Sequence, residues 1–383
     1  MQAFITPAVA VPGRQQQWST RIAFFIAGFA LAAWAPLVPY AQVRVGLGDG
    51  SLGLLLLCLG CGSIVAMPLA GVLAGRFGCR SVLLMGSALV CLTLPLLAVA
   101  TTFPLLAAAL FAFGAAIGTI DCVVNIQAVI VERASGKTMM SGFHGLFSVG
   151  GIVGAGGVSL LLTLGASPLG ATLAAVALVL LAIARAAPHL LPEAAAAGGP
   201  LFVWPRGVVL FIGILCFVVF LTEGAVLDWS AVFLTRLRAV EPSQAGLAYA
   251  AFATAMTIGR LLGDRIVRRV GGRRVLAAGG LLAALGLTLA TLHPAWEAAL
   301  AGFALVGAGC ANIVPVLYSL VGRQKVMPEH AAVSAITTIG YAGILAGPAA
   351  IGLVAHFTSL SIALLGVAVL LLGVAASGRI LRL

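Results

Sequence analysis

Charged residues are scarce in this sequence, and their scarcity excludes several classes of protein. Only 8% of the 383 residues are Asp, Glu, Lys or Arg, whereas 62% are hydrophobic. Soluble domains carry about 25% charged and roughly 45–50% apolar residues. So few charges do not cover a water-facing surface of this size, which excludes a soluble globular protein, a disordered chain and a nucleic-acid-binding protein. The composition indicates an integral membrane protein.

Motifs for catalysis, metal binding and redox chemistry are also missing. Cys58 and Cys61 form a C-x-x-C pair, but no histidine or second cysteine pair accompanies them, so we interpret the seven cysteines as packing residues. The glycine-rich runs lie inside apolar segments and do not resemble nucleotide-binding loops. We therefore expect no enzyme, no metal site, no catalytic residue and no cofactor, with a proton as the coupling ion.

Long apolar runs follow one another along the chain. A bilayer core about 30 Å thick requires about 20 helical residues to cross it. Runs of this length are predicted at residues 21–42, 51–75, 81–100, 104–131, 138–165, 168–187, 206–235, 243–267, 274–292, 295–321, 330–355 and 358–378. The sequence therefore predicts an all-α membrane protein with twelve transmembrane helices in two groups of six. The predicted parts are a flexible cytoplasmic tail (1–20), an N-terminal bundle (21–188), a cytoplasmic linker (189–205), a C-terminal bundle (206–378) and a short tail (379–383).

Basic residues indicate the orientation in the membrane. If both termini are cytoplasmic, all but three of the 21 Lys and Arg residues fall on the cytoplasmic side, the exceptions being Arg44, Arg236 and Arg238. Cytoplasmic loops of membrane proteins carry an excess of these residues. The bias accounts for the net charge of +11. It predicts a multi-pass protein of the inner (plasma) membrane with both termini in the cytoplasm.

The two predicted bundles carry similar motifs. Residues 71–80 (GVLAGRFGCR) follow the second span, and residues 259–265 (GRLLGDR) end the eighth, so each is a glycine-rich helix end that runs into a basic loop. Likewise, residues 150–154 (GGIVG) in the fifth span are similar to residues 343–347 (GILAG) in the eleventh. Repeats of this kind are typical of secondary transporters, whose substrate site lies between the halves near the middle of the membrane.

These motifs resemble those of a known family. Residues 71–80 resemble the signature loop of the major facilitator superfamily, G-x-L-A-D-R-x-G-R-[RK], and the resemblance extends over essentially the whole chain. Residues 121–125 (DCVVN) and 141–151 (SGFHGLFSVGG) resemble the fourth and fifth spans of its fucose-permease-like members, and residues 223–230 (EGAVLDWS) resemble a bacterial branch of that group. The resemblance implies the major facilitator fold, alternating access, sugar:proton symport and a monomer.

Two features depart from the family pattern. Gly75 stands where the signature loop has an acidic residue, whereas the second repeat keeps Asp264. The first span, residues 22–43, contains no acid, although fucose-type relatives have a second acid there for their proton site. A relay between two carboxylates in those positions is therefore not carried over to this chain.

A polar column is predicted on the fourth and fifth spans. Asp121 and Asn125 are four residues apart and share a helix face. Asn125 and His144 lie equally far from the intervening turn, so we expect them at similar depth, with Asp121 about 5.4 Å nearer the middle of the membrane. We expect no basic side chain at that depth, and because an unpaired charge there is costly, we interpret Asp121 as a proton carrier or substrate ligand. The alternative for Asp121 is a structural acid paired with a neighbouring helix. For His144, contact with substrate or proton sharing with Asp121 competes with simple packing.

The seventh span contains two further acids. Glu223 and Asp228 are five residues apart and point about 140° away from each other. Glu223 lies nearer the middle of the membrane and is predicted to take part in proton coupling and substrate binding. Asp228 and Trp229 lie toward the outer end, where they form either an outer gate that stacks on a sugar ring or, for the indole, an interface anchor. Trp34 in the first span has the same two interpretations.

Asparagine occurs only at Asn125 and Asn312, in the fourth and tenth spans, which correspond between the repeats. This match favours substrate binding by both amides. Hydrogen bonding between helices is the alternative, and it contributes roughly 0.6 kcal/mol in membranes.

A conformational latch is predicted at the cytoplasmic end of the eighth span. Asp264 is placed to cap the N-terminus of the fifth span, where the helix dipole is positive. Arg260 and Arg265 would balance this acid, and Arg76 is the corresponding basic residue of the first repeat. We expect these contacts to exist only while the cytoplasmic side is closed.

Together these features predict a symporter that imports a small polar solute, favoured to be a sugar or sugar derivative, with protons across the bilayer. One alternative is proton-coupled efflux of amphipathic compounds, which the apolar walls and scarce polar groups favour. Another is a receptor that does not transport, although the short linker and tails disfavour it. The expected partners are the substrate and the lipid bilayer.

Overall fold

The computed structural model describes residues 13–47, 49–192, 204–241 and 244–381, and these ranges are almost entirely helical. The N-terminal half contains α1 (Arg14–Ala33), the short 3-10 helix η1 (Ala35–Leu37), α2 (Val38–Val45), α3 (Asp49–Val99), α4 (Phe103–Ser135), α5 (Met140–Thr163), α6 (Pro168–Ala186) and the 3-10 helix η2 (Ala187–His189). The C-terminal half contains α7 (Val208–Arg238), α8 (Leu247–Val270), α9 (Gly272–Leu292), α10 (Trp296–Cys310), α11 (Ile313–Val321), α12 (Glu329–Phe357) and α13 (Leu360–Ser377).

These helices make the twelve membrane crossings that the sequence predicts. Ten segments of the described chain are individually long and apolar enough to cross a bilayer. One of them lies in α3, whose 51 residues contain two crossings because the chain turns back at Gly78, where φ is 79° and ψ is 158°. The other additional crossing is α8, whose charged residues lower its hydropathy. The first crossing consists of α1, η1 and α2, and the tenth consists of α10 and α11.

The first helix begins earlier than predicted. It starts at Arg14, so residues 14–20 are helical and do not belong to a flexible tail. The backbone N–H of Gly13 donates to Oε1 of Gln16 over 2.8 Å and caps the helix. Further along, Nε2 of Gln127 in α4 donates to the buried hydroxyl of Thr20 over 3.0 Å. Two polar residues of this stretch, Gln16 and Thr20, thus have partners within the fold. Residues 1–12 lie outside the described ranges.

The start of the predicted linker also packs on the bundle. The N–H of Leu191 donates to Oε1 of Gln127 over 3.2 Å, and the N–H of Arg80 donates to the carbonyl of Leu191 over 2.8 Å. Residues 193–203, most of the predicted linker, lie outside the described ranges, as do residues 382–383 of the C-terminal tail.

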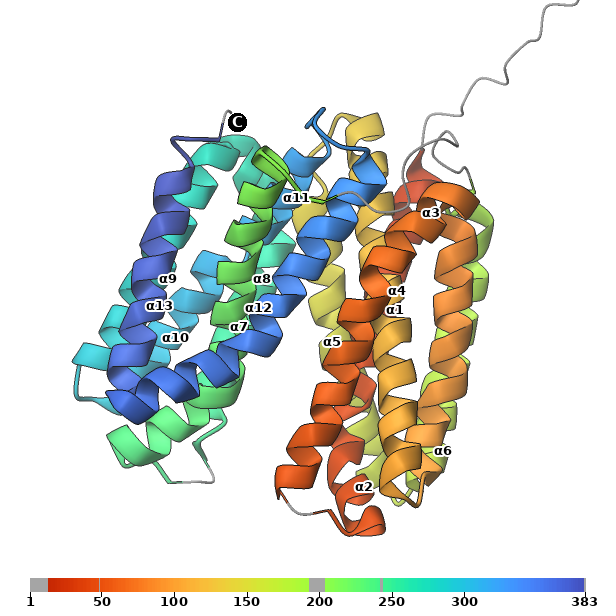
Figure 1. Cartoon of the computed structure of the whole chain (residues 1–383), viewed down its shortest axis with the longest axis horizontal. Helices are drawn as coiled ribbons and strands as arrows, with labels where there is room; N and C mark the ends of the chain where they lie inside the picture. The colour runs from red at the N-terminus through yellow and green to blue at the C-terminus, as the bar shows by residue number, and fades with distance from the viewer. Residues whose placement is uncertain (1–12, 48, 193–203, 242–243, 382–383) are drawn as a thin grey trace, which may run out of the picture.

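The two halves lie side by side and approach each other at one end (Figure 1). At that end α1 begins, α13 ends, and the arginine-rich turn between α8 and α9 is found; we call it the basic end. Near it, α5 contacts α8, α3 and α4 contact α12, and α11 contacts both α4 and α5. Toward the opposite end the two sets of helices diverge (Figure 1).

The repeated glycine motifs make matching contacts in the two halves. A Cβ added to Gly150 in α5 would lie 2.3 Å from the carbonyl oxygen of Phe25 in α1, and one added to Gly343 in α12 would lie 2.3 Å from that of Phe217 in α7. Helix backbones approach this closely only at small residues, which drive helix association in membranes. The sequence repeat is therefore a repeat of helix packing.

Two arginines that break the charge bias have matching partners as well. Arg44 in α2 donates from Nε and Nη2 to the carbonyls of Ala100 and Leu97 at the end of α3, over 2.8 and 2.7 Å. In the C-terminal half, Nη2 of Arg238 in α7 donates to the carbonyls of Ala290 and Thr291 at the end of α9, both over 2.9 Å. Each guanidinium thus satisfies terminal carbonyls that a helix leaves unpaired. We call Arg44 and Arg238 the capping arginines.

Candidate functional site

A buried arginine occupies the contact between the halves. Arg260 of α8 is only 6% exposed. Its Nη2 lies 3.2 Å from Oε1 of Glu223 in α7, and its Nη1 donates to the hydroxyl of Ser148 in α5 over 3.1 Å. Because α5 belongs to the N-terminal half and α7 and α8 to the C-terminal half, Arg260 bridges the two.

The position of Arg260 corrects two predictions. It lies ten residues before the end of α8 at Val270, which is about 15 Å along the helix and half of a bilayer core. Arg260 therefore does not belong to a latch at the basic end, and a basic side chain does lie at mid-depth. The cluster of arginines that follows it in the sequence concealed this position.

Asp121 lies near the same arginine, from the other half of the protein. It is buried in α4, within electrostatic reach of Arg260 and beside the hydroxyl of Tyr341 in α12. The amide of Asn125 donates to the backbone carbonyl of Asp121 over 2.8 Å, while its Oδ1 is buried with no hydrogen-bond partner among the described residues. Glu223 forms the ion pair with Arg260, whereas Asp121 of the opposite half makes no ion pair or hydrogen bond with that guanidinium among the described residues.

His144 lies in an aromatic cluster next to this site. Its Nδ1 is 3.1 Å from the carbonyl oxygen of Met140, and its ring centroid lies 5.1 Å from that of Phe24 and 5.6 Å from that of Tyr318. These contacts agree with the alternative that His144 serves only to pack the helices. A role for His144 in proton sharing or substrate contact stays a prediction.

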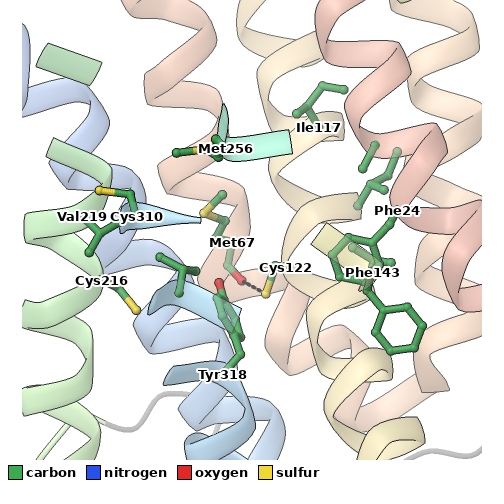
Figure 2. Packing of buried hydrophobic residues seen from close by; sticks show 14 of the residues in the cluster. Phe24, Met67, Ile117, Cys122, Phe143, Cys216, Val219, Met256, Cys310 and Tyr318 are labelled. Atoms are coloured by element: carbon green, nitrogen blue, oxygen red, sulfur yellow. Dashed lines mark hydrogen bonds between the residues drawn. The ribbon is translucent and has the colours of Figure 1, made fainter. Parts of the chain in front are cut away.

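Further hydrogen bonds lie between this cluster and the basic end, and one of them joins the two halves. The hydroxyl of Tyr318 lies 2.7 Å from that of Thr337 in α12. Figure 2 shows Tyr318 pointing toward Met67 and Cys122, whose thiol donates to the carbonyl of Met67. The same carbonyl accepts a hydrogen bond of 2.9 Å from Ser334 in α12. Since Ser334 is seven residues before Tyr341, this layer lies about 10 Å nearer the basic end than the charged centre.

No hydrogen bond or ion pair joins the predicted outer residues to Arg260 within the described ranges. Asp228 is exposed, and the indole N–H of Trp229 donates to the carbonyl of Pro348 in α12 over 3.1 Å. Trp34 is 4% exposed, and its indole nitrogen has no partner among the described residues. Neither indole N–H faces outward in the way that a membrane anchor requires, and their predicted contacts with substrate are untested.

Asn312 lies where the tenth crossing is broken into α10 and α11. Its amide donates to the carbonyl of Gly259 in α8 over 3.0 Å, and its Oδ1 is buried without a hydrogen-bond partner among the described residues. Asn125 and Asn312 therefore each have a buried side-chain oxygen without a partner among the described residues. Only the amide of Asn312 donates to a neighbouring helix.

Asp264 caps α5 at the basic end, in the position that the sequence argument gave it. Oδ1 of Asp264 accepts from the N–H of Gly142 over 3.2 Å, and its backbone carbonyl accepts from the hydroxyl of Thr138 over 3.1 Å. Arg265 and Arg76, the other predicted latch residues, are exposed, and Arg76 lies over the ring of Phe77.

Two further contacts at the basic end were missed from the sequence. Glu132 accepts from the N–H groups of Met139 and Met140 over 2.7 and 2.8 Å and so also caps α5. Arg133 of α4 forms an ion pair with Glu329 in the first turn of α12. The signal available in the sequence was the pair of charges at Glu132 and Arg133, at the end of an apolar span. The sequence does not show that Glu329 is the partner of Arg133.

These features define a class of protein, a twelve-helix membrane transporter with a polar centre between two similar halves. The family model of the Major Facilitator Superfamily matches residues 212–382. An MFS-type transporter of Yersinia pestis is 60% identical over 369 residues, 96% of each chain. The membrane protein MosC of Rhizobium meliloti is 33% identical over 348 residues, covering 89% of this chain and 84% of MosC. The chain belongs to the major facilitator superfamily.

Solved structures confirm the fold. The E. coli fucose:proton symporter FucP superposes with a TM-score of 0.80 at 18% identity, covering 95% of this chain and 98% of FucP. The proton:xylose symporter XylE gives a TM-score of 0.74 at 13% identity, covering 95% and 94%. The predicted fold and the resemblance to the superfamily are thus confirmed, and the protein is a multi-pass membrane transporter.

Proposed function

We propose that this transporter is a proton-coupled symporter that imports a sugar or similar polyhydroxylated solute across the bacterial inner membrane as a monomer. In this proposal the basic end faces the cytoplasm, as the distribution of Lys and Arg favours. The observation that carries the proposal is the buried centre between the halves, where Arg260 pairs with Glu223 and the buried acid Asp121 of the opposite half has no ion-pair partner among the described residues.

The electrostatics of this arrangement support proton binding. A charge at the centre of a membrane helix costs about 2.5–3.5 kcal/mol by insertion scales, and a buried charge without a partner is strongly destabilising. One guanidinium compensates one carboxylate, so the second carboxyl group is more stable with a proton. Asp121 is the better proton carrier because Glu223 already pairs with Arg260.

The closed basic end supports a state that is open to the outside. The contacts of Asp264 with α5 and of Ser334 with Met67 join the halves on that side. A proton and a solute would enter from the opposite end, where the halves diverge (Figure 1). One charge that crosses 100 mV supplies about 2.3 kcal/mol, sufficient for accumulation of tens-fold. The likeness to the fucose and xylose symporters supports the sugar class.

Transport by purified protein in liposomes tests the proposal. Pools of radiolabelled sugars, sugar acids and cationic dyes are screened with an imposed pH gradient. Uptake of a sugar that is driven by inward proton flow is the expected result, whereas dye movement against the proton flow would favour efflux. Binding without movement would favour a receptor.

The carrier role is tested with Asp121→Asn, which is expected to abolish uptake driven by the pH gradient and to leave the protein folded. Glu297→Gln, an exposed acid at the start of α10, is the matched control and is expected to behave as wild type. Wild-type coupling in Asp121→Asn would rule the role out.

A further inference from the structure

We propose that the C-terminal half binds an anionic phospholipid with two phosphate groups, of the diphosphatidylglycerol class, on the surface of α9 and α13 at the basic end. Arg273 and Arg274 in the first turn of α9 and Arg379, two residues after the end of α13, form the polar part of this surface. We call these three residues the arginine cluster. The proposal does not rest on sugar symport, because this site lies on the outside of the protein and within one half.

The three arginines lie together because the ends of the two helices are in contact. A Cβ added to Gly378 after α13 would lie 3.0 Å from the carbonyl oxygen of Arg273 and 3.5 Å from its Cγ. Arg379 directly follows Gly378. Farther along the helices, a Cβ added to Gly280 of α9 would lie 2.7 Å from the backbone nitrogen of Ala375 in α13. The close packing of α9 and α13 thus brings the cluster together.

No acidic side chain of the described ranges pairs with this cluster. All three arginines are exposed, and neither α9 nor α13 contains an Asp or Glu. The ion pairs found in the described part of the chain involve other arginines. Three like charges at adjacent helix ends repel one another, so an anion that lies among them stabilises the C-terminal half.

Exposed apolar side chains continue from the cluster along both helices. On α9, Leu281 and Leu285 lie seven and eleven residues after Arg274, so they share its helix face, and both are exposed. On α13, Val369 and Leu372 are exposed as well. Both helices lie at the outer edge of the C-terminal half (Figure 1), and neither takes part in the main contacts between the halves. These apolar faces therefore meet acyl chains.

The orientation of the protein accounts for basic residues at this end but not for their concentration. The matching corner of the N-terminal half is where α6 ends against the second crossing of α3. Arg80 is half-buried there, and Arg185 of α6 is exposed. The N–H of Arg80 donates to the carbonyl of Leu191 over 2.8 Å, and Leu190 is buried, so residues that follow α6 cover this corner. The C-terminal half leaves three arginines exposed at the same place.

The directions of the arginines favour two phosphate groups over one. Successive residues of a helix point about 100° apart, so Arg274 lies above the apolar face of α9, whereas Arg273 lies beside α13. One phosphate between Arg273 and Arg379 would leave Arg274 unpaired. A second phosphate, joined to the first by a glycerol, would reach it, and the four acyl chains of such a lipid would divide between the two helices. Basic sites between membrane helices bind headgroups of this kind, and guanidinium groups bind phosphate by paired hydrogen bonds.

Titration of the purified protein with defined lipids tests the proposal. Native mass spectrometry of the protein in detergent counts the bound lipid molecules and gives a Kd for diphosphatidylglycerol, phosphatidylglycerol and phosphatidylethanolamine. We expect one diphosphatidylglycerol to bind about fivefold more tightly than phosphatidylglycerol, because its second phosphate meets one more arginine. Phosphatidylethanolamine, which has no net charge, should bind most weakly. Diphosphatidylglycerol should also raise the melting temperature.

Neutralisation of the cluster should remove this binding. Arg273→Gln, Arg274→Gln and Arg379→Gln in one protein should raise the Kd for diphosphatidylglycerol about a hundredfold, since each arginine near an anionic headgroup contributes about fivefold. Without lipid, the melting temperature should be unchanged or higher, because the three charges repel one another. The single variant Arg274→Gln should raise the Kd about fivefold, and it keeps the test decisive if the triple variant does not fold.

The matched control removes the same charge from the same end of the protein. It combines Arg14→Gln, Arg185→Gln and Arg206→Gln, three exposed arginines outside the cluster, and should bind the lipid as the unaltered protein does. Unchanged affinity in the cluster variant, or an equal loss in the control, would overturn the site. Equal affinities for phosphatidylglycerol and diphosphatidylglycerol would overturn the assignment to a lipid with two phosphates. None of these measurements depends on transport, so this proposal and the sugar symport fail separately.

Discussion

The N-terminal and C-terminal halves share their packing but not their charges. Gly150 and Gly343 allow the same close approach to α1 and α7, and the capping arginines Arg44 and Arg238 bind the ends of α3 and α9 in the same way. In contrast, Asp264 of α8 has Gly75 as its counterpart in α3, and the mid-depth cation Arg260 has none that the sequence repeat reveals. The repeat therefore preserves the helix packing of the two halves, whereas their charged residues differ, with Asp121 in one half and the pair of Arg260 and Glu223 in the other.

The basic end illustrates how the halves compensate for this difference. Asp264 supplies a carboxylate to the N-terminus of α5. At Gly75 the space is occupied by the ring of His330, which lies about 2.9 Å from where a Cβ would be, and α12 carries its own acid, Glu329, paired with Arg133. The signature loop thus lacks an acid at Gly75 that would have capped α12, and α12 carries an acid of its own, Glu329, in its first turn.

Alanine at the repeated glycines should have the largest effect, and an equal one in the two halves. Gly150→Ala and Gly343→Ala each place a Cβ about 2.3 Å from a backbone oxygen, so we expect a loss of about 3 kcal/mol, the upper range for overpacking. Melting in detergent measures it. Gly156→Ala in α5, which meets nothing within 4 Å, is the control. A large loss in only one half would show that the repeat does not share its packing.

Removal of the capping arginines should have a smaller effect, again in both halves. Arg44→Ala and Arg238→Ala each leave two helix-terminal carbonyls without their charged donor, and such hydrogen bonds contribute about 2 kcal/mol. We expect similar decreases in melting temperature for the two variants. Arg236→Ala, an exposed neighbour, should change little, and an equal decrease there would contradict the explanation.

Asp264→Ala should have the smallest of these effects on stability and should alter the conformational balance. Loss of the cap on α5 costs about 1 kcal/mol, or roughly a fivefold shift toward opening at the basic end. Alkylation of a cysteine at Ser319, which lines a small pocket with Asp264 and Ser141, measures this opening. Arg269→Ala on the exposed end of α8 is the matched control. Unchanged alkylation in Asp264→Ala would argue against the latch.

The sequence predicts the crossings, the repeat and the cap by Asp264 because each depends on local patterns. Apolar length sets the crossings, glycine spacing sets the close helix pairs, and an acid at a helix end matches a helix N-terminus across the turn. The depth of Arg260 was missed because it is followed by Arg265, Arg268 and Arg269, so the charge pattern placed it at the membrane surface. Its pairing with Glu223 depends on how α7 and α8 are rotated, which the composition of neither helix determines.

The same limit applies to the first helix and to the tenth crossing. Gln16 and Thr20 look like loop residues until the cap and Gln127 supply their partners. The break before α11 fits Pro315, which has no N–H to donate to the carbonyl of Ala311, but the sequence does not show the bond from Asn312 to Gly259.

That bond ties the interrupted crossing to the charged centre, since Gly259 directly precedes Arg260 in α8. At Asn312 the helical ladder of α10 and α11 is already open, so this point bends at lower cost than an intact helix. Its counterpart α4 is continuous through Asn125. A rotation of α8 would therefore be transmitted through Gly259 to this break, where α11 can tilt relative to α10, whereas α4 has no such break at Asn125.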